Sequence, residues 1–221
     1  MEGRVIKSTG SWYEVIGTDG QHYTCRLQGK LRLEDSRSSN PVAVGDRVAL
    51  LISDKDASIT EVLPRTNHIL RQSVKRTSHS QVLAANVDQV LLVATLHQPR
   101  TSLGFIDRFL VSAESFRVPQ ILVFNKKDLW SDKDRAYIHI LTQLYESLGV
   151  TCLSISAQEV SDIEIIRDCI NGKTTLVAGH SGVGKSTLLN QLHPDIHQAI
   201  RAVSDVTDKG THTTTFAEMF A

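Results

Sequence analysis

The stretch "VAGHSGVGKSTLLN" at residues 177–190 decides the fold class of this chain. Gly179, Gly184, Lys185 and Ser186 match the pattern GxxxxGK[ST], in which a glycine-rich loop joins a strand to a helix. Successive backbone N–H groups of such a loop point toward phosphate oxygens, and the helix behind it turns its positive end toward the same anion. We therefore predict a phosphate-binding loop (P-loop) that holds a nucleotide.

The residue types in the P-loop suggest individual roles. Lys185 would reach the outer phosphates and support catalysis there, and the Ser186 hydroxyl would ligate Mg²⁺. We expect the His180 side chain to point toward solvent. A ligand-free glycine-rich turn is the alternative, and the apolar strand before the loop and the helix after it argue against this. The predicted contacts to the nucleotide are Gly179, His180, Ser181, Gly182, Val183, Gly184, Lys185, Ser186 and Thr187.

An α/β pattern precedes the P-loop rather than following it. Continuous apolar runs predict buried parallel strands, and apolar residues at helical spacing predict helices between them. Such alternation indicates a doubly wound parallel sheet with helices on both faces. We place this domain at residues 88–221. The predicted strands are 88–96, 119–125, 150–156 and 173–179, and the predicted helices are 102–117, 132–148, 161–171 and 184–193.

The segment "FNKKDL" at residues 124–129 favours guanine over adenine. Asn125, Lys126 and Asp128 fit the pattern NKxD at the carboxyl end of a predicted strand, where ligands of such sheets bind. The Asp128 carboxylate could accept from both N1–H and N2–H₂ of guanine, a pair of donors that adenine does not offer. Lys126 could lie along the base, and Lys127 occupies the free position nearby. Without the P-loop, this pattern would be no more than a charged loop after a strand.

Two further observations concern the guanine site. Ser156 and Ala157 in "LSISAQ" match a short SA element whose backbone N–H meets the guanine O6. The predicted base-binding residues thus precede the P-loop, although a P-loop usually opens its domain. Strand adjacency rather than chain order forms the site of a parallel sheet, so we predict a circularly permuted nucleotide-binding domain.

The first 67 residues have a different character. Short apolar runs alternate with turn residues, and Asp19-Gly20 is a hairpin signal, so we predict a small all-β barrel such as an OB-fold at residues 1–67. Residues 68–87 read as a linker or surface loop. Within 64–87 no acidic residue occurs, which is compatible either with a solvated connector or with contacts to a phosphate backbone. The basic residues of this stretch are Arg65, Arg71, Lys75 and Arg76.

Composition limits the classes of protein. Lys plus Arg is 24 and Asp plus Glu is 24, which argues against nucleic-acid binding through bulk charge. The three cysteines are widely spaced and form no CxxC pair, so reduced thiols are expected. The sequence has no signal-peptide core and no long apolar run. We therefore expect a cytoplasmic protein that does not associate with a membrane.

The order of these motifs, with "KGTHTTT" at 209–215, resembles the RsgA family (also called YjeQ). Members are circularly permuted GTPases that act in maturation of the small ribosomal subunit. The resemblance extends through most of the chain. It rests on "VGDRV" (44–48), "PRTNHILR" (64–71), "AANVDQV" (84–90), "FIDRFL" (105–110), "NKKDL" (125–129) and "SGVGKSTLLN" (181–190).

The resemblance implies an N-terminal OB-fold, guanine nucleotide with Mg²⁺, and the small subunit and its rRNA as partners of a monomer. It also implies that "THTTT" is the first switch, with Thr214 favoured over Thr213 and Thr215 as a Mg²⁺ ligand. His212 would orient the attacking water, although a solvated histidine is the alternative.

The sequence departs from the family after "FAEMFA". The second switch, DxPG, and the cysteine and histidine cluster of the family's C-terminal zinc domain are not in it. We therefore expect an incomplete GTPase domain that binds guanine nucleotide weakly, hydrolyses it poorly and contains no zinc.

Two other functions stay open at this stage. One is a catalytically inert module whose barrel and basic linker hold RNA, with Trp12, Tyr13 and Tyr23 as candidates for base stacking, although core packing is an alternative for each. The other is a P-loop kinase, which the NKKD segment disfavours.

Overall fold

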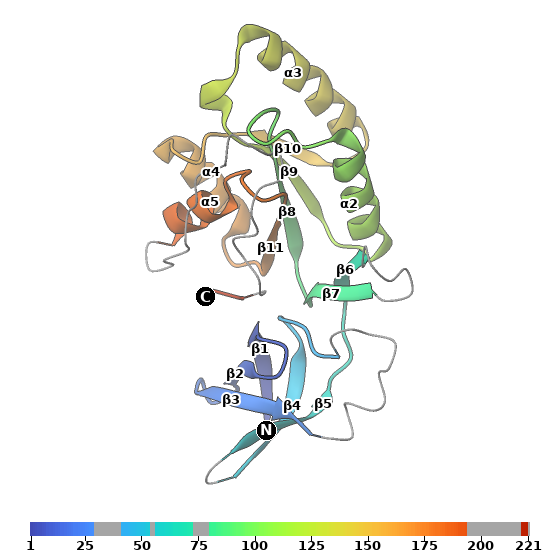
Figure 1. Cartoon of the computed structure of the whole chain (residues 1–221), viewed down its shortest axis with the longest axis vertical. Coiled ribbons are helices and arrows are strands. Elements are labelled where there is room, and N and C mark those ends of the chain that lie inside the picture. The colour runs from blue at the N-terminus through green and yellow to red at the C-terminus, as the bar shows by residue number, and fades with distance from the viewer. Residues whose placement is uncertain (29–40, 54–55, 73–79, 194–217, 221) are drawn as a thin grey trace. The chain divides into compact units, whose positions relative to one another are not determined.

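The computed structural model describes residues 1–28, 41–53, 56–72, 80–193 and 218–220 (Figure 1). Two compact units divide the chain between Val87 and Asp88. The first contains residues 1–87 with the described residues 218–220, and the second contains residues 88–193. No helix within these described ranges has the length and apolar character to cross a membrane.

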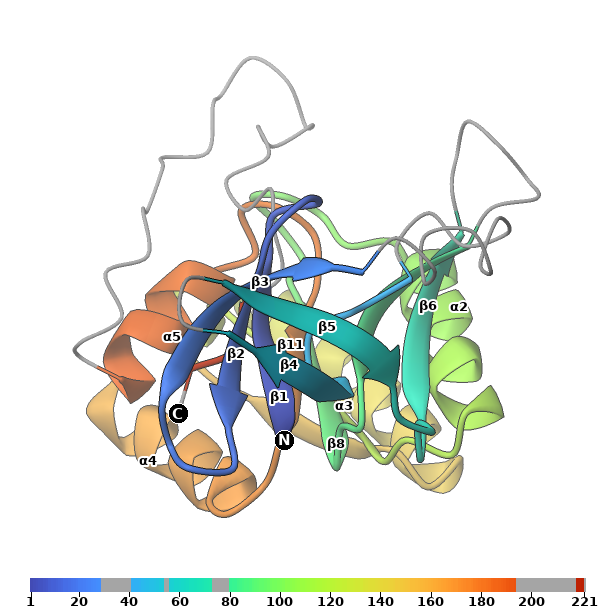
Figure 2. The same cartoon turned by 90° about the horizontal axis from the view of Figure 1, so that it is seen from below.

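The first unit contains a closed five-stranded barrel, which confirms the predicted all-β, OB-like architecture (Figure 2). The strand order is β1-β2-β3-β5-β4, and pairing of β1 with β4 closes the barrel. Strands β3 and β5 are parallel, whereas the other pairs are antiparallel. The strands are β1 (Glu2–Ser8), β2 (Tyr13–Gly17), β3 (His22–Leu27), β4 (Arg47–Ile52) and β5 (Ala57–Val62).

The barrel core follows from alternation along its strands. Val5, Val15 and Ile59 are fully buried, while their strand neighbours face outward or lie at the rim. Tyr13 is 2% exposed and packs in this core, so of the two interpretations of this residue the structure supports core packing and not base stacking. Gly20, with φ of 78°, lies between β2 and β3 at the predicted hairpin turn.

Residues 68–87, for which the sequence predicts a linker or loop, contain two paired strands. Strand β6 (His68–Gln72) runs antiparallel to β7 (Ser80–Ala85). Ile69, Val82 and Ala84 are buried in this hairpin. The basic residues and the short apolar runs conceal this hairpin in the sequence. Lys75 and Arg76 lie outside the described residues.

A buried ion pair joins the "VGDRV" segment to "PRTN". Asp46 is fully buried and accepts two hydrogen bonds of 2.7 Å from the Arg65 guanidinium, one on each carboxylate oxygen. Its Oδ2 also accepts from the Ala43 N–H at 2.8 Å. Gly45 next to it has φ of 91°, and a Cβ there would lie 2.0 Å from the Ala85 carbonyl oxygen. Only glycine therefore fits between the barrel and β7.

The second unit is a four-stranded parallel sheet in the order β10-β9-β8-β11. Its strands are β8 (Gln89–Ala94), β9 (Gln120–Phe124), β10 (Thr151–Ser154) and β11 (Thr175–Ala178). Every residue of β8 is buried, as expected for a central strand covered on both faces. This confirms the predicted α/β domain.

Helices cover both faces of this sheet (Figure 1). On one face, α2 and α3 pack against Leu92, Leu122 and Phe124, and on the other α4 and α5 pack against Leu91 and Val123. The helices are α2 (Leu103–Ser115), α3 (Asp132–Ser147), α4 (Val160–Ile170) and α5 (Lys185–Leu192).

Helix α3 begins at a capping box. The Ser131 side chain accepts from the Asp134 N–H, and the Asp134 carboxylate accepts from the Ser131 N–H. Asp134 also contacts the His97 ring at 3.0 Å. Hydrogen bonds from His97 and then Ser131 lower the pKa of the Asp134 carboxyl to about 2. The cap fixes where the chain after β9 turns into α3.

The strand order creates a topological switch point between β8 and β11. The chain moves from β8 outward to β9 and β10, and then returns to place β11 on the other side of β8. Helix α2 after β8 and helix α5 after β11 lie on opposite faces of the sheet. Ligands of open parallel sheets bind at the carboxyl end of such a switch point.

Replacing Arg65 tests how much the buried ion pair contributes to the barrel unit. We expect Arg65→Met to lower the free energy of unfolding by about 2–3 kcal/mol, because it leaves the buried Asp46 carboxylate without its cation. Urea denaturation followed by tryptophan fluorescence measures the change. Arg47→Met is the matched control, since Arg47 is exposed and its guanidinium donates a long hydrogen bond of 3.4 Å to the Pro64 carbonyl. Equal effects of the two changes would contradict the prediction.

Candidate nucleotide-binding site

The P-loop connects β11 to α5, as the sequence predicts, and its backbone depends on glycine. Gly179, Gly182 and Gly184 have φ of 145°, 83° and 99°. A Cβ on Gly179 would lie 2.3 Å from the Val93 carbonyl oxygen, and one on Gly184 would lie 2.3 Å from the Asn125 amide nitrogen. The loop therefore lies tightly against β8 and against the loop after β9.

Lys185 and Ser186 occupy the first turn of α5. The Lys185 amine donates to the carbonyl oxygens of Gly179 at 2.9 Å and His180 at 2.6 Å, so it lies over its own loop. Burial lowers the pKa of this amine. Ser186 and Thr187 follow in the same turn and are half-buried. A hydroxyl at this position offers the hard oxygen ligand that Mg²⁺ prefers.

His180 has a partner that the sequence does not indicate. Its ring lies 3.9 Å, centroid to centroid, from that of Phe105 in α2. Burial and then the charge of Lys185 lower the pKa of the His180 imidazole. The residue is exposed overall, but its side chain packs on α2 instead of simply pointing into solvent, which corrects the expectation.

Asn125 connects three loops of the site. Its amide nitrogen donates to the Val183 carbonyl in the P-loop at 2.8 Å, and its carbonyl oxygen accepts from the Ala157 N–H at 3.0 Å. Its own N–H donates to Ala94 at the end of β8. The side chain is buried, so its bonds hold the loops together.

The NKKD segment continues from Asn125 in a strained turn. Lys126 adopts a left-handed backbone with φ of 68°, and its amine donates to the Gln98 carbonyl. Burial lowers the pKa of the Lys126 amine, although the charge of Asp128 opposes this shift. Asp128 lies in a short 3-10 helix, Lys127–Leu129, and is exposed. Its carboxylate is thus available at the rim.

Lys127 is not a free position. Its amine forms ion pairs with Asp162 at 2.7 Å and Glu159 at 3.1 Å, and the hydrogen bond to Asp162 is the main reason why the pKa of Lys127 is raised. Asp162 is 3% exposed, and its second oxygen accepts from the Ser156 N–H at 2.7 Å. Sequence reasoning missed both acids, because an acid near a helix start is ordinarily explained by the helix dipole.

The SA element lies between these two anchors. The Ser156 N–H donates to Asp162 and the Ala157 N–H to Asn125. The next amide, that of Gln158, donates only at 3.3 Å to the Ser156 hydroxyl. Gln158, which the sequence analysis did not select, therefore has the longest hydrogen bond of these three amides.

One pocket unites the predicted base-binding residues with the P-loop. It contains residues from the loops after β9, β10 and β11, although the P-loop is last in the chain. Both halves of the predicted site thus meet at the carboxyl edge of the sheet. The lining residues are Asn125, Lys126, Asp128, Ser156, Ala157, Gln158, Gly184 and Thr187.

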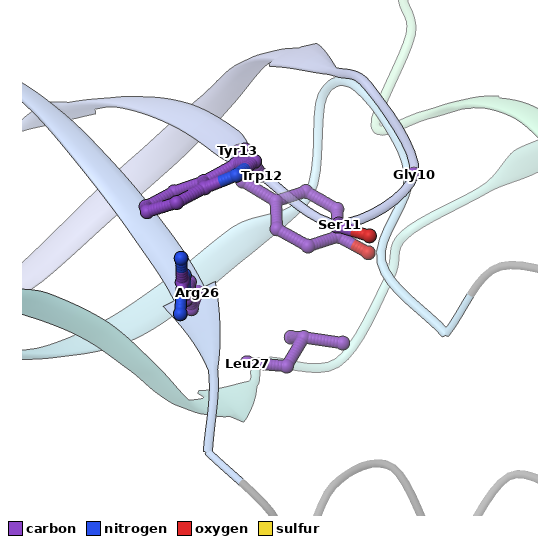
Figure 3. A pocket seen from close by; sticks show the side chains of 6 residues that line it. All are labelled: Gly10, Ser11, Trp12, Tyr13, Arg26 and Leu27. Carbon is purple, nitrogen blue, oxygen red and sulfur yellow. The ribbon is translucent and has the colours of Figure 1, made fainter.

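A second pocket lies on the barrel, between the β1–β2 turn and the end of β3 (Figure 3). Its volume is about 300 Å³. The Arg26 guanidinium lies 3.8 Å from the centroid of the Trp12 ring, and Trp12 is 41% exposed. Tyr23, the third aromatic candidate, instead donates its hydroxyl to Asp19 at 2.6 Å. Gly10, Ser11, Tyr13 and Leu27 complete the lining.

The switch candidates His212 and Thr214, with Thr213 and Thr215, lie outside the described residues. No group of three or more histidine, cysteine or acidic side chains arranged for a metal occurs among the residues that the structure describes.

The fold and the nucleotide pocket define the class of this protein. It is an OB-like barrel followed in the chain by a P-loop nucleotide-binding domain in permuted order. Family models agree along the chain, with the RsgA N-terminal domain matching residues 2–59 and the RsgA GTPase matching residues 62–221. The chain belongs to the RsgA family of GTPases.

Curated relatives support this assignment over the whole chain. The chain is 47% identical over 222 residues to small ribosomal subunit biogenesis GTPase RsgA 2 of Bacteroides thetaiotaomicron, covering all of this chain and 72% of the relative. It is also 47% identical over 221 residues to small ribosomal subunit biogenesis GTPase RsgA of Bacteroides fragilis, covering 71% of that protein.

Solved structures agree with the fold. YjeQ from Thermotoga maritima matches with a TM-score of 0.70 and 32% identity, over 94% of this chain and 68% of that one. YloQ, described as a circularly permuted GTPase, matches with a TM-score of 0.62 and 29% identity, over 89% of this chain and 65% of that one.

Asn125→Asp tests whether this side chain holds the pocket together. The change keeps the acceptor for Ala157 but places a carboxylate oxygen against the Val183 carbonyl, where a donor is required. We expect GDP affinity to fall by at least about tenfold, since an unmade buried hydrogen bond costs about 1–3 kcal/mol. Isothermal titration calorimetry measures this. Asn171→Asp, at the exposed end of α4, is the control and should bind GDP normally. Unchanged affinity in Asn125→Asp would refute the role.

Proposed function

We propose that this chain binds guanine nucleotide with Mg²⁺, hydrolyses GTP, and acts in assembly of the small ribosomal subunit. The observation that carries the proposal is the shared pocket of Asp128, Gln158, Gly184 and Thr187, in which base-binding and phosphate-binding elements meet. The family relationship adds to it, because the relatives are named for GTP hydrolysis in biogenesis of this subunit.

Guanine recognition falls to three groups in this proposal. The Asp128 carboxylate accepts from N1–H and N2–H₂, the Lys126 stem lies along the base, and a backbone N–H after Ser156 donates to O6. Since Ala157 already donates to Asn125, the Gln158 amide is the better candidate for O6. Asn125 acts indirectly, because both ends of its side chain bind protein groups.

The phosphates lie over the P-loop. Backbone N–H groups of residues 179–187 and the Lys185 amine offset the phosphate charge, and this charge grows on the leaving oxygen during the reaction. Water attacks the γ-phosphorus, the bond to the β–γ bridging oxygen breaks, and GDP, phosphate and a proton result. The Ser186 hydroxyl would hold Mg²⁺, which would supply positive charge to neutralise the phosphates. His212 would orient the water, and Thr214 would be the second protein ligand.

The barrel would meet rRNA in this proposal. Trp12 is the exposed aromatic candidate, and the guanidinium of Arg26 stacks on it. An aromatic ring with an adjacent cation suits an unpaired base and its phosphate. We propose that the protein works as a monomer in the cytoplasm. No comparison favours the alternative of an inert RNA-binding module.

Asp128→Asn tests guanine recognition. The amide replaces an acceptor by a donor, so we expect GDP affinity to fall by about 100-fold, as two charge-assisted hydrogen bonds are lost. Xanthosine diphosphate, which has a carbonyl oxygen in place of the N2 amine, should gain affinity. Calorimetric titration of GDP, ADP and xanthosine diphosphate measures both effects, and single-turnover GTP hydrolysis accompanies it. Equal binding of GDP and ADP by the unaltered chain would overturn the proposal.

Trp12→Ala tests the contact to the subunit. We expect co-sedimentation with purified small subunits, in the presence of a non-hydrolysable GTP analogue, to fall about tenfold, because base stacking on an aromatic ring contributes about 1–3 kcal/mol. GDP affinity should stay the same, since Trp12 belongs to the barrel unit. Tyr137→Ala, at an exposed aromatic residue of α3 in the second unit, is the matched control. If Trp12→Ala sediments as the unaltered chain does, the Trp12 contact is refuted.

A further inference from the structure

Asp162 in α4 is a buried carboxylate to which the proposed reaction gives no role. It is 3% exposed and is not among the residues that line the nucleotide pocket. Its two oxygens instead bind the two base-recognition loops, Oδ1 accepting from the Lys127 amine and Oδ2 from the Ser156 N–H, each at 2.7 Å.

The geometry of Lys127 connects this carboxylate to Asp128. Lys127 begins the 3-10 helix that carries Asp128, and its N–H donates to the Ile155 carbonyl at 3.0 Å. The amine of the same residue extends to the first turn of α4, where Glu159 provides a second, more exposed partner. Both the backbone and the side chain of Lys127 therefore hold the NKKD turn against the SA element.

Asn125 and Asp162 each accept a hydrogen bond from a different amide of the SA element. Asn125 binds the Ala157 N–H and the P-loop, whereas Asp162 binds the Ser156 N–H and the NKKD turn. With these two amides engaged, Gln158 is the residue of the pocket lining whose N–H has a longer bond, of 3.3 Å to the Ser156 hydroxyl. The Asp162 side chain is only 4% exposed and its bond to Lys127 is charge-assisted, so these bonds restrict the spacing between Asp128 and Gln158 more strongly than neutral exposed bonds would.

We propose that Asp162 is a positioning residue for guanine selectivity: through Lys127 and Ser156 it sets the distance between the Asp128 carboxylate and the O6-binding amide. This inference rests on the proposed guanine site, but it assigns selectivity to a helix residue outside the NKKD and SA motifs. Asp162 touches no part of the base and acts only through the two loops.

The test compares GDP, inosine diphosphate and ADP as probes. Inosine diphosphate lacks the N2 amine that Asp128 reads, so the affinity ratio of GDP to inosine diphosphate reports the position of Asp128. The affinity for ADP reports the contacts to the phosphates alone. In Asp162→Asn, one side-chain oxygen still accepts from Ser156, but the bond and ion pair with Lys127 are lost.

We expect Asp162→Asn to weaken GDP binding about tenfold while ADP binding is unchanged, so that the ratio of GDP to inosine diphosphate contracts at least about threefold. Glu164→Gln is the matched control on the same helix, because Glu164 is exposed and pairs only within α4, with Arg167 at 3.4 Å. It should leave all three affinities unchanged.

A purely structural role predicts a different result. Asp162→Asn would then lower the melting temperature and weaken the binding of GDP, inosine diphosphate and ADP by the same factor. An unchanged affinity ratio of GDP to inosine diphosphate overturns the inference. If Asp162→Asn does not fold, Lys127→Met removes the exposed partner of the same pair and must contract the same ratio. The double variant should show no more loss than the single ones, and additive losses also overturn the inference.

The outcome for the unaltered chain separates this inference from the proposed function. An unaltered chain without preference for GDP over ADP contradicts the proposed function itself. A guanine-selective chain whose ratio is insensitive to Asp162→Asn contradicts only the assignment of Asp162.

Discussion

The nucleotide pocket depends on the two hydrogen bonds of the Asn125 side chain. One binds the Val183 carbonyl and the other the Ala157 N–H, so a single buried amide joins the loops after β9, β10 and β11. A primary amide offers a donor and an acceptor at opposite corners of one plane, which no carboxylate or ammonium can do. Gly184 lies so close to this amide that any side chain would displace it. The Asn125 side chain therefore fixes the position of the P-loop relative to the base-recognition loops.

The parallel sheet explains why the reversed motif order has no effect on the site. Strands β8 and β11 are neighbours although three helices lie between them in the chain. All four strands end at the same edge, and a pocket built there from their loops depends on which strands pair. Permutation changes which connections are made between elements, and it leaves the pairing of β8 with β9 and β11 as it is. The barrel unit is held by its own core and by the Asp46–Arg65 pair.

Much of the fold could be predicted because the relevant signals are local. The continuous apolar run of β8 and the helical spacing of Ile106, Leu110 and Ala113 predict a buried strand and a one-sided helix. The hairpin of β6 and β7 could not be predicted in this way. Its strands have only five and six residues, and pairing across an intervening segment stabilises them. The surroundings of Lys127 and His180 were misjudged for a similar reason, since a motif position says nothing about packing partners such as Phe105 or Asp162 that lie elsewhere in the sequence.

The sequence alone determined the class of this protein: a P-loop, an NKKD segment and an SA element are short and depend on residue type, because backbone conformation and hydrogen-bonding capacity are local properties. The reversed order of these motifs along the chain was also evident from the sequence alone. Only the tertiary structure decided that Asn125 and Asp162 connect these elements, that Trp12 with Arg26 lies at the barrel surface, and that Tyr13 lies in its core. These are contacts between residues far apart in the chain, and they exist only after the sheet and the barrel have brought the partners within hydrogen-bonding or packing distance.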